Sequence, residues 1–206
     1  RLSVAYRAVL RAVRDGTISR QRLDEAVGRI LRLKERRGLF RGTTADPGRA
    51  RAIIRSAAHR ATAERIAERA VTLVRNDGGL LPLRERTVYV TGPREEALSA
   101  ALRRAGVKVS GTYAGADAVV LTTLNAGSST AARVRAFGSK PVVVAALGRP
   151  YDLDRAGRAD AALATYSSGA PAVRALAKVI AGVVKPTGRL PVRAGGMPVG
   201  HGLTYK

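Results

Sequence analysis

The chain contains no cysteine, no tryptophan, two histidines and two phenylalanines. Without cysteine it can form no disulfide, use no thiol in catalysis and bind no metal through sulfur, and the redox compartment stays open. His59 and His201 share no metal-binding spacing, so we expect no metal site. The scarcity of aromatic residues leaves no stacking platform for single-stranded nucleic acid. No segment has the apolar length of a membrane span.

Acidic residues are also scarce, since 37 basic residues face 15 acidic ones and the net charge is +22. One interpretation is a polyanionic partner, such as nucleic acid or an anionic cell-wall polymer. The other is composition, because only six of the basic residues are lysine and alanine, glycine, valine and arginine are all abundant, as in a GC-rich genome. The basic residues are scattered along the chain, which favours composition. We therefore expect polyanion binding that is nonspecific and confined to low salt.

The N-terminal residues 1–41 are predicted to be helical. One face of the second helix collects apolar residues at helical spacing, namely Leu23, Ala26, Val27, Ile30 and Leu31. Ser19 is placed to cap that helix. Residues 42–48 have neither helical nor strand periodicity, which is typical of a linker. The sequence thus predicts a division into residues 1–41, a linker at 42–48 and a domain at 49–206.

The larger domain is predicted to be α/β. A helix is expected from Asp46-Pro47 to about Arg75, ended by the turn residues 76–79. Apolar strands then alternate with amphipathic helices. Strands are expected at 88–90, 107–109, 118–123, 141–147 and 161–164, and helices at 97–105, 129–137 and 171–184. This alternation predicts a mostly parallel sheet covered by helices on both faces, a three-layer αβα sandwich.

Few residues in this domain suggest chemistry of their own. Thr91-Gly92-Pro93 resembles a phosphate-binding turn, but proline removes a donor and no glycine-rich nucleotide motif is present, so no cofactor is expected. Glu64 and Glu68 share a helix face among arginines, which predicts a solvated stripe of ion pairs. Asp152 and Asp154 follow a strand end, where they could belong to a ligand site or cap the next segment.

Several segments carry a resemblance to a known family. Residues 185–192 (Lys-Pro-Thr-Gly-Arg-Leu-Pro-Val) and the closing run 198–205 resemble the tail of a family 3 glycoside hydrolase. Residues 15–40 are similar to the end of that family's catalytic barrel, and residues 59–83 to the helix that enters its second domain. Residues 122–126 and 149–153 favour the bacterial β-N-acetylglucosaminidase branch, which is linked to peptidoglycan turnover. Together the matches cover nearly the whole chain in the family's order.

The resemblance implies an αβα sandwich beside a (β/α)8 barrel, with residues 1–41 as the last barrel helices and connector. In the family the nucleophilic aspartate lies on the barrel, as does the histidine acid/base of this branch. The other branch takes a glutamate from the second domain, but residues 110–135 contain only Asp117 as a carboxylate. We therefore assign no catalytic residue and expect the chain alone to be inactive. Because it starts at Arg1, we expect a processed product, a single domain or a fragment.

By the same resemblance, Asn125, Arg149, Tyr151 and Asp152 are expected to line one edge of a sugar cleft, and they follow predicted strand ends. The expected partners are a catalytic barrel and a carbohydrate. His201, between two glycines, is expected at the barrel interface.

Three alternatives stay open: a stand-alone module for carbohydrate or anionic cell-wall polymer, a basic nucleic-acid-binding domain, and a parent enzyme that uses phosphate instead of water. The compartment stays open as well.

Overall fold

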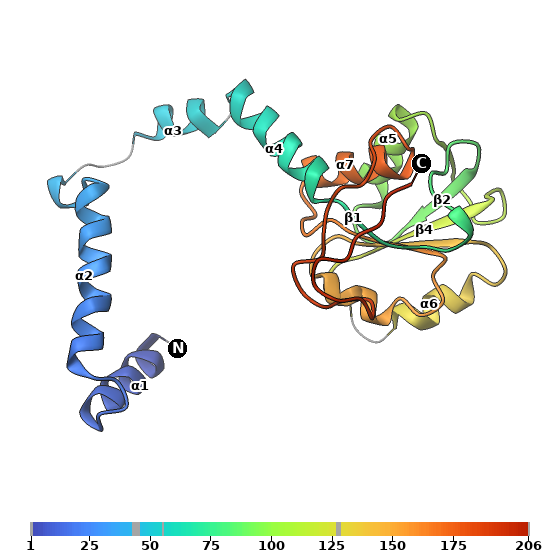
Figure 1. Cartoon of the computed structure of the whole chain (residues 1–206). Helices are drawn as coiled ribbons and strands as arrows, with labels where there is room; N and C mark the ends of the chain where they lie inside the picture. The colour runs from blue at the N-terminus through green and yellow to red at the C-terminus, as the bar shows by residue number, and fades with distance from the viewer. Residues whose placement is uncertain (1, 43–45, 55, 127–128, 206) are drawn as a thin grey trace. The chain divides into compact units, whose positions relative to one another are not determined.

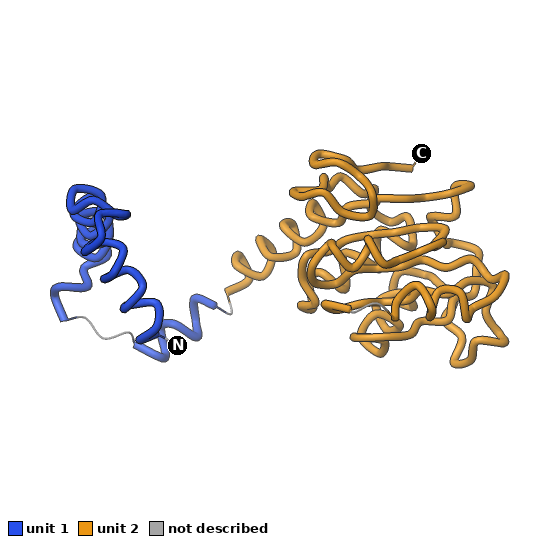
Figure 2. The backbone as a smooth tube through the Cα atoms, turned by 90° about the horizontal axis from the view of Figure 1, so that it is seen from below, with its two compact units in different colours: residues 1–54 blue, residues 55–206 orange. Residues whose placement is uncertain are grey.

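The computed structural model describes residues 2–42, 46–54, 56–126 and 129–205 (Figure 1). The chain divides into two compact units, residues 1–54 and residues 55–206 (Figure 2). The linker predicted at 42–48 lies partly outside the described residues and stays a prediction. Among the described residues, no helix is long and apolar enough to cross a membrane.

Unit 1 is helical, which confirms the helices predicted within residues 1–41, and it also includes a helix that was expected to belong to the larger domain. It contains α1 (Leu2–Arg14), α2 (Arg20–Arg36), the short 3-10 helix η1 (Leu39–Arg41) and α3 (Pro47–Ile54). The predicted cap is confirmed, because Ser19 Oγ accepts a hydrogen bond from Arg22 N at 3.1 Å. Asp46 likewise accepts from Gly48 N at 2.8 Å at the start of α3. None of the described residues of these four elements is buried.

Unit 2 is the predicted α/β domain. Its helices are α4 (Ala57–Ala70), η2 (Asp77–Gly79), α5 (Glu95–Arg104), α6 (Thr130–Ala136), η3 (Pro150–Arg155) and α7 (Ala170–Ile180). Its strands are β1 (Thr72–Asn76), β2 (Thr87–Thr91), β3 (Lys108–Ser110), β4 (Ala118–Thr123), β5 (Val142–Ala146) and β6 (Ala161–Ala164). The six strands form one sheet in the order β1-β6-β5-β4-β2-β3, and only the β1–β6 pair is antiparallel.

Two apolar layers lie on opposite faces of this sheet, as the continuous apolar strands predict. Helices α5 and α7 lie on one face, and α6 with η3 on the other (Figure 1). Strand β4 shows the division, because Ala118 and Val120 belong to the first layer while Val119 and Leu121 belong to the second. Alternate side chains of a strand point to opposite faces, so a strand covered on both sides has to be apolar throughout. The three-layer sandwich is therefore confirmed.

The predicted long helix ending near Arg75 is wrong. Helix α3 ends at Ile54, and Ser56 Oγ starts α4 by accepting from His59 N at 3.2 Å. Helix α4 then stops at Ala70, and residues 72–76 form β1. The β-branched residues of this segment suit a strand, and pairing with β6 settles the outcome, which helical periodicity alone does not reveal.

The outer edge of β1 is covered by the C-terminal segment. Gly188 N donates to Val71 O at 3.1 Å, and Leu203 N donates to Leu73 O at 2.7 Å. His201 Nε2 donates to Val74 O at 2.9 Å, at the point where the β1–β6 ladder shifts register. An uncovered edge strand is a template for pairing with other chains, so this cover completes the sheet. The structure places the His201 ring on β1, and its predicted contact with a barrel stays a prediction.

Tyr205 anchors the end of this segment. Its hydroxyl donates to Val179 O, at the end of α7, and to Val184 O at 3.1 Å. Burial raises the pKa of Tyr205 to about 12, and the nearby Arg84 opposes the shift. The run that resembles the family tail is therefore a structural clasp between β1 and α7.

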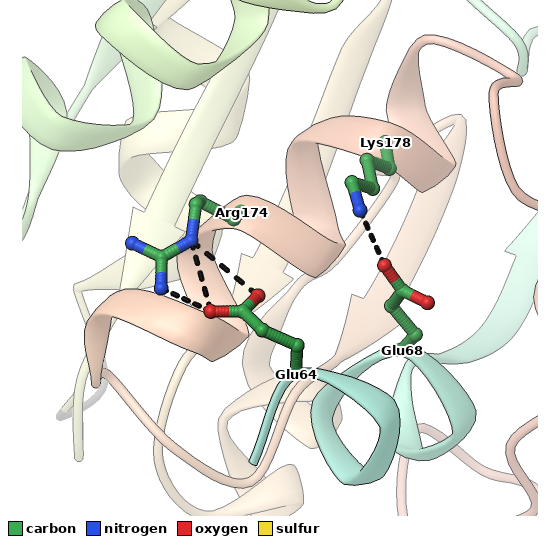
Figure 3. A network of polar contacts seen from close by, with 4 residues as sticks. All are labelled: Glu64, Glu68, Arg174 and Lys178. Atoms are coloured by element: carbon green, nitrogen blue, oxygen red, sulfur yellow. Dashed lines mark hydrogen bonds and ion pairs between the residues drawn. The ribbon is translucent and has the colours of Figure 1, made fainter. Parts of the chain in front are cut away.

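The expected ion pairs of Glu64 and Glu68 are present, but their partners lie on α7. Glu64 pairs with Arg174 and Glu68 with Lys178 (Figure 3). Both partners advance by four residues in the same direction, so α4 and α7 run side by side and parallel, with matching turns facing each other. These pairs join α4, the helix that enters unit 2, to α7 of the sandwich.

Candidate functional site

The parallel strands bring several polar loops to one edge of the sheet. Strands β4 and β5 are neighbours, and their last residues Thr123 and Ala146 stand in register. Because parallel strands end at the same edge, the loops that follow them lie together, and open α/β sheets place ligands there. All four predicted site residues belong to the loops after β4 and β5.

Two of the predicted residues touch directly. Arg149 Nε donates a hydrogen bond to Asn125 Oδ1 at 2.9 Å, and both side chains are exposed. Tyr151 lies two residues further on and is 49% exposed. The edge therefore presents a guanidinium, an amide and a phenol ring to solvent.

The fourth predicted residue is placed differently. Asp152 is only 3% exposed, and its Oδ1 accepts from Ala126 N at 3.0 Å. Its Oδ2 has no hydrogen-bond partner among the described residues, and neither has Thr123 Oγ1 at the end of β4. Asp154, offered with Asp152 as a ligand or a cap, is exposed and accepts from Gly195 N at 2.6 Å. Both carboxyl groups thus hold backbone N–H groups of other loops.

Three residues at this edge adopt left-handed backbone conformations although they are not glycine. Arg94, Asn125 and Tyr166 have φ of 67°, 53° and 58°, and they follow β2, β4 and β6. Such conformations are uncommon in residues with a Cβ, and they cluster at functional sites. Their gathering at one edge marks it independently of the sequence motifs.

Sequence reasoning missed Arg94 and Tyr166. Arg94 Nε donates to Ser168 O at 3.0 Å, which ties the loop after β2 to the loop after β6. Tyr166 OH shares a hydrogen bond of 2.8 Å with Thr72 Oγ1, and burial raises its pKa. The sequence carries no signal for either contact, because the partners are 74 and 94 residues away along the chain.

The turn resembling a phosphate-binding loop is packed against β4. Thr122 Oγ1 donates to Pro93 O at 2.7 Å and to Thr91 O at 3.2 Å. Gly92 has φ of 107° and lies so close to Thr122 that a Cβ would collide with its backbone. The Thr122 side chain therefore occupies the space that a phosphate would need in this turn, which lies between β2 and β4, where the strand order reverses.

The described residues contain no group of three or more metal-binding side chains.

Asp117, which is the only carboxylate between residues 110 and 135, lies at the opposite edge of the sheet, before β4. Its Oδ2 accepts from Thr87 N at 2.8 Å, which ties β2 to the start of β4. This arrangement gives Asp117 a structural role.

Comparison with known proteins decides the family. Residues 115–196 match the Glycosyl hydrolase family 3 C-terminal domain. This part of unit 2 belongs to the family 3 C-terminal domain. The resemblance inferred from the motifs is thereby confirmed.

Two named relatives are β-N-acetylglucosaminidases. The chain is 47% identical over 75 residues to a Beta-N-acetylglucosaminidase/beta-glucosidase of Cellulomonas fimi, which covers 36% of this chain and 13% of that protein. A family 3 β-N-acetylglucosaminidase from Paenibacillus sp. str. FPU-7 is 28% identical with a TM-score of 0.62, over 90% of this chain and 42% of that chain.

The same fold occurs in the β-glucoside phosphorylase BglX, which is 22% identical with a TM-score of 0.61, over 93% of this chain and 42% of that one. The chain thus spans less than half the length of these relatives.

Proposed function

We propose that this chain is the non-catalytic C-terminal part of a family 3 glycosidase that acts on β-N-acetylglucosaminides, including sugars derived from the cell wall. The observation that carries the proposal is the exposed Asn125–Arg149 pair beside the half-exposed Tyr151, at the carboxyl edge of a family 3 sandwich. The named relatives support the choice of sugar. In this proposal the nucleophile and the acid/base come from a barrel domain.

The chemistry of the exposed pair suits an uncharged sugar. The Arg149 guanidinium offers several N–H donors, and hydrogen bonds from a charged donor are about twice as strong as neutral ones. Tyr151 adds an aromatic surface with a hydroxyl at its end, and such amphipathic rings are common in binding sites. A sugar that carries hydroxyl and acetamido oxygens offers acceptors to these donors.

Unit 1 supports the proposed barrel partner. Its described helices bury no residue, yet they carry large apolar side chains that are mostly exposed. These residues are Leu2, Val4, Tyr6, Val9, Val27, Ile30, Leu31, Leu33, Leu39, Phe40, Ile53 and Ile54. Helices with such a stripe need a surface to cover it. We propose that the barrel supplies that surface, and that without it the chain self-associates.

The first test is turnover of an aryl β-N-acetylglucosaminide by the purified chain. No hydrolysis is expected, because the proposal places the catalytic groups elsewhere. Hydrolysis that disappears on changing a carboxylate of this chain would show that unit 2 holds its own active site and would refute the proposal.

The second test is a chimera. Residues 57–206 replace the corresponding domain of the Paenibacillus enzyme, and folding is checked by circular dichroism. The chimera is expected to hydrolyse the aryl substrate, and Arg149→Ala in it to raise KM about tenfold, as loss of a charged hydrogen bond predicts. The matched control Arg103→Ala, on the distant helix α5, should leave KM unchanged. If the chimera folds and Arg149→Ala leaves its KM unchanged, the proposed contact between Arg149 and the sugar is contradicted.

A further inference from the structure

The loops after β4 and β5 are joined by two reciprocal hydrogen bonds. The first loop gives Asn125 Oδ1 as acceptor for Arg149 Nε, at 2.9 Å. The second loop gives Asp152 Oδ1 as acceptor for Ala126 N, at 3.0 Å. Each loop therefore supplies one donor and one side-chain acceptor, which lie one residue apart in the first loop and three residues apart in the second. We expect the two bonds to be coupled, because breaking one of them loosens a loop that takes part in the other.

The bond from Asp152 acts on a turn that is unfavourable by itself. Asn125 has φ of 53°, a left-handed conformation that costs energy for residues other than glycine. Asp152 fastens Ala126, the very next residue, so the strained turn is held from the buried side. The loop also depends on Gly148, because a Cβ there would lie 2.9 Å from Leu124 Cδ1 and 3.0 Å from Asn125 Oδ1.

The stability of the fold alone does not explain why residue 152 is an aspartate. Its side chain is buried, and one of its two oxygens has no partner among the described residues. Burying an unsatisfied polar atom destabilises a fold. An asparagine could accept from Ala126 N equally well, so the bond to the loop accounts for one oxygen. The one hydrogen bond that the Asp152 side chain makes among the described residues holds the turn at Ala126.

When the turn at Asn125 is held in this way, Asn125 and Arg149 present hydrogen-bond donors at the surface. Arginine has no acceptor, so the amide oxygen of Asn125 has to face Arg149, and the amide nitrogen faces elsewhere. The two bonds that hold the loops do not use the Nη groups of Arg149, and its side chain is exposed. Donors of this kind bind acceptor oxygens of a ligand, such as a carbonyl or a hydroxyl.

We propose that Asp152 is a positioning residue: through Ala126 and Asn125 it holds the Arg149 guanidinium as a donor to an acceptor oxygen of the ligand. Asp152 itself does not touch the ligand. That the ligand is a sugar rests on the proposed function, whereas the coupling between Asp152 and Arg149 does not.

The coupling can be measured in the complete chain without any ligand, by hydrogen exchange at the Arg149 Nε–H in ¹⁵N NMR spectra. Asp152→Ala should speed this exchange roughly fivefold, the effect of losing one net hydrogen bond. Asn125→Ala should speed it by at least as much. Asp152→Asn keeps an acceptor for Ala126 N and should exchange like the wild type. Asp154→Ala, which removes a carboxyl group of the same helix from Gly195 N, is the matched control and should leave Arg149 unchanged.

An unchanged Arg149 exchange rate in Asp152→Ala overturns the proposal, and so does a rate in Asp152→Asn as fast as in Asp152→Ala. If Asp152→Ala does not fold, Asp152→Ser replaces it, since serine keeps a polar group there but is too short to reach Ala126 N. A slow rate in the folded serine variant equally overturns the proposal.

Titration with N-acetylglucosamine then separates the two claims. A shift of the Arg149 Nε–H signal that is kept in Asp152→Asn and lost in Asp152→Ala supports both. Exchange rates as expected with no response to this sugar in any variant would support the positioning role and count against the proposed function.

Discussion

Arg174 of α7 donates from Nε to both carboxylate oxygens of Glu64 on α4, at 3.1 and 3.4 Å, and also from its Nη2. This hydrogen bonding raises the pKa of the Arg174 guanidinium. One turn along both helices, Lys178 pairs with Glu68 (Figure 3). Two ion pairs one turn apart show that α4 and α7 run parallel and side by side.

The two rungs should show weak, salt-sensitive coupling. A double-mutant cycle with Glu64→Ala and Arg174→Ala, followed by urea unfolding, is expected to give a coupling free energy of roughly 0.5 to 1 kcal/mol. The value is small because the two side chains are 31% and 43% exposed. It should shrink in 1 M salt, where screening is strong. A coupling unaffected by salt would contradict this account.

Gly188 should not tolerate a side chain. A Cβ at this position would run into the backbone oxygens of Ala70 and Val71, which belong to the approach to β1. Gly188→Ala is therefore expected to lower the free energy of unfolding by at least about 2 kcal/mol, a loss typical of forced overpacking. Gly111→Ala is the matched control, because a Cβ there meets nothing within 4 Å. Similar melting curves for the two variants would refute the close approach.

His201 should stabilise the sheet edge through its ring. Replacing it with alanine leaves Val74 O without its donor, and we expect a loss of about 1 kcal/mol in the free energy of unfolding. Val199→Ala, two residues earlier and 61% exposed, should change stability by much less. Denaturant unfolding of the two variants side by side makes the comparison, and equal losses would rule out a specific role of the ring.

Tyr205 should make the domain sensitive to alkali. Its folded pKa is raised from 10.0 to about 12, so the folded state keeps the proton that the unfolded state releases. The contribution of Tyr205 to stability is therefore complete below pH 10 and is lost as the pH rises toward 12. Tyr205→Phe should remove this component, giving a flatter fall in melting temperature between pH 9.5 and 11.5 than the wild type shows. Parallel curves for the two proteins would contradict the raised pKa.

Local patterns predicted most of the sandwich but not its first strand. Strand β4 follows from the apolar run 118–121 and the two β-branched threonines after it, and α5 from the apolar spacing that includes Leu98 and Leu102. Strand β1 was predicted as helix, because its pairing with β6 joins residues nearly 90 positions apart. Such pairing overrides local propensity, and no local pattern contains it.

The candidate site likewise has features that the sequence predicts and features that it does not predict. Strand-end position predicts that Asn125 and Arg149 lie at one edge, because parallel strands end together. The strand ends do not reveal that Asp152 turns inward to Ala126, since this depends on how the short helix η3 packs. The left-handed turns at Arg94 and Tyr166 likewise arise from loops that meet only in the folded chain.

The clasp on β1 also sets an order for biosynthesis. Strand β1 is among the first parts of unit 2 to leave the ribosome, but the groups that cap its outer edge, Gly188 and Leu203, emerge more than a hundred residues later. During that interval the nascent sheet carries a free edge able to recruit a neighbouring chain. The edge of β1 therefore stays uncovered until residues 188–203 have been made, and a product that stops before them would expose an edge able to pair with other chains.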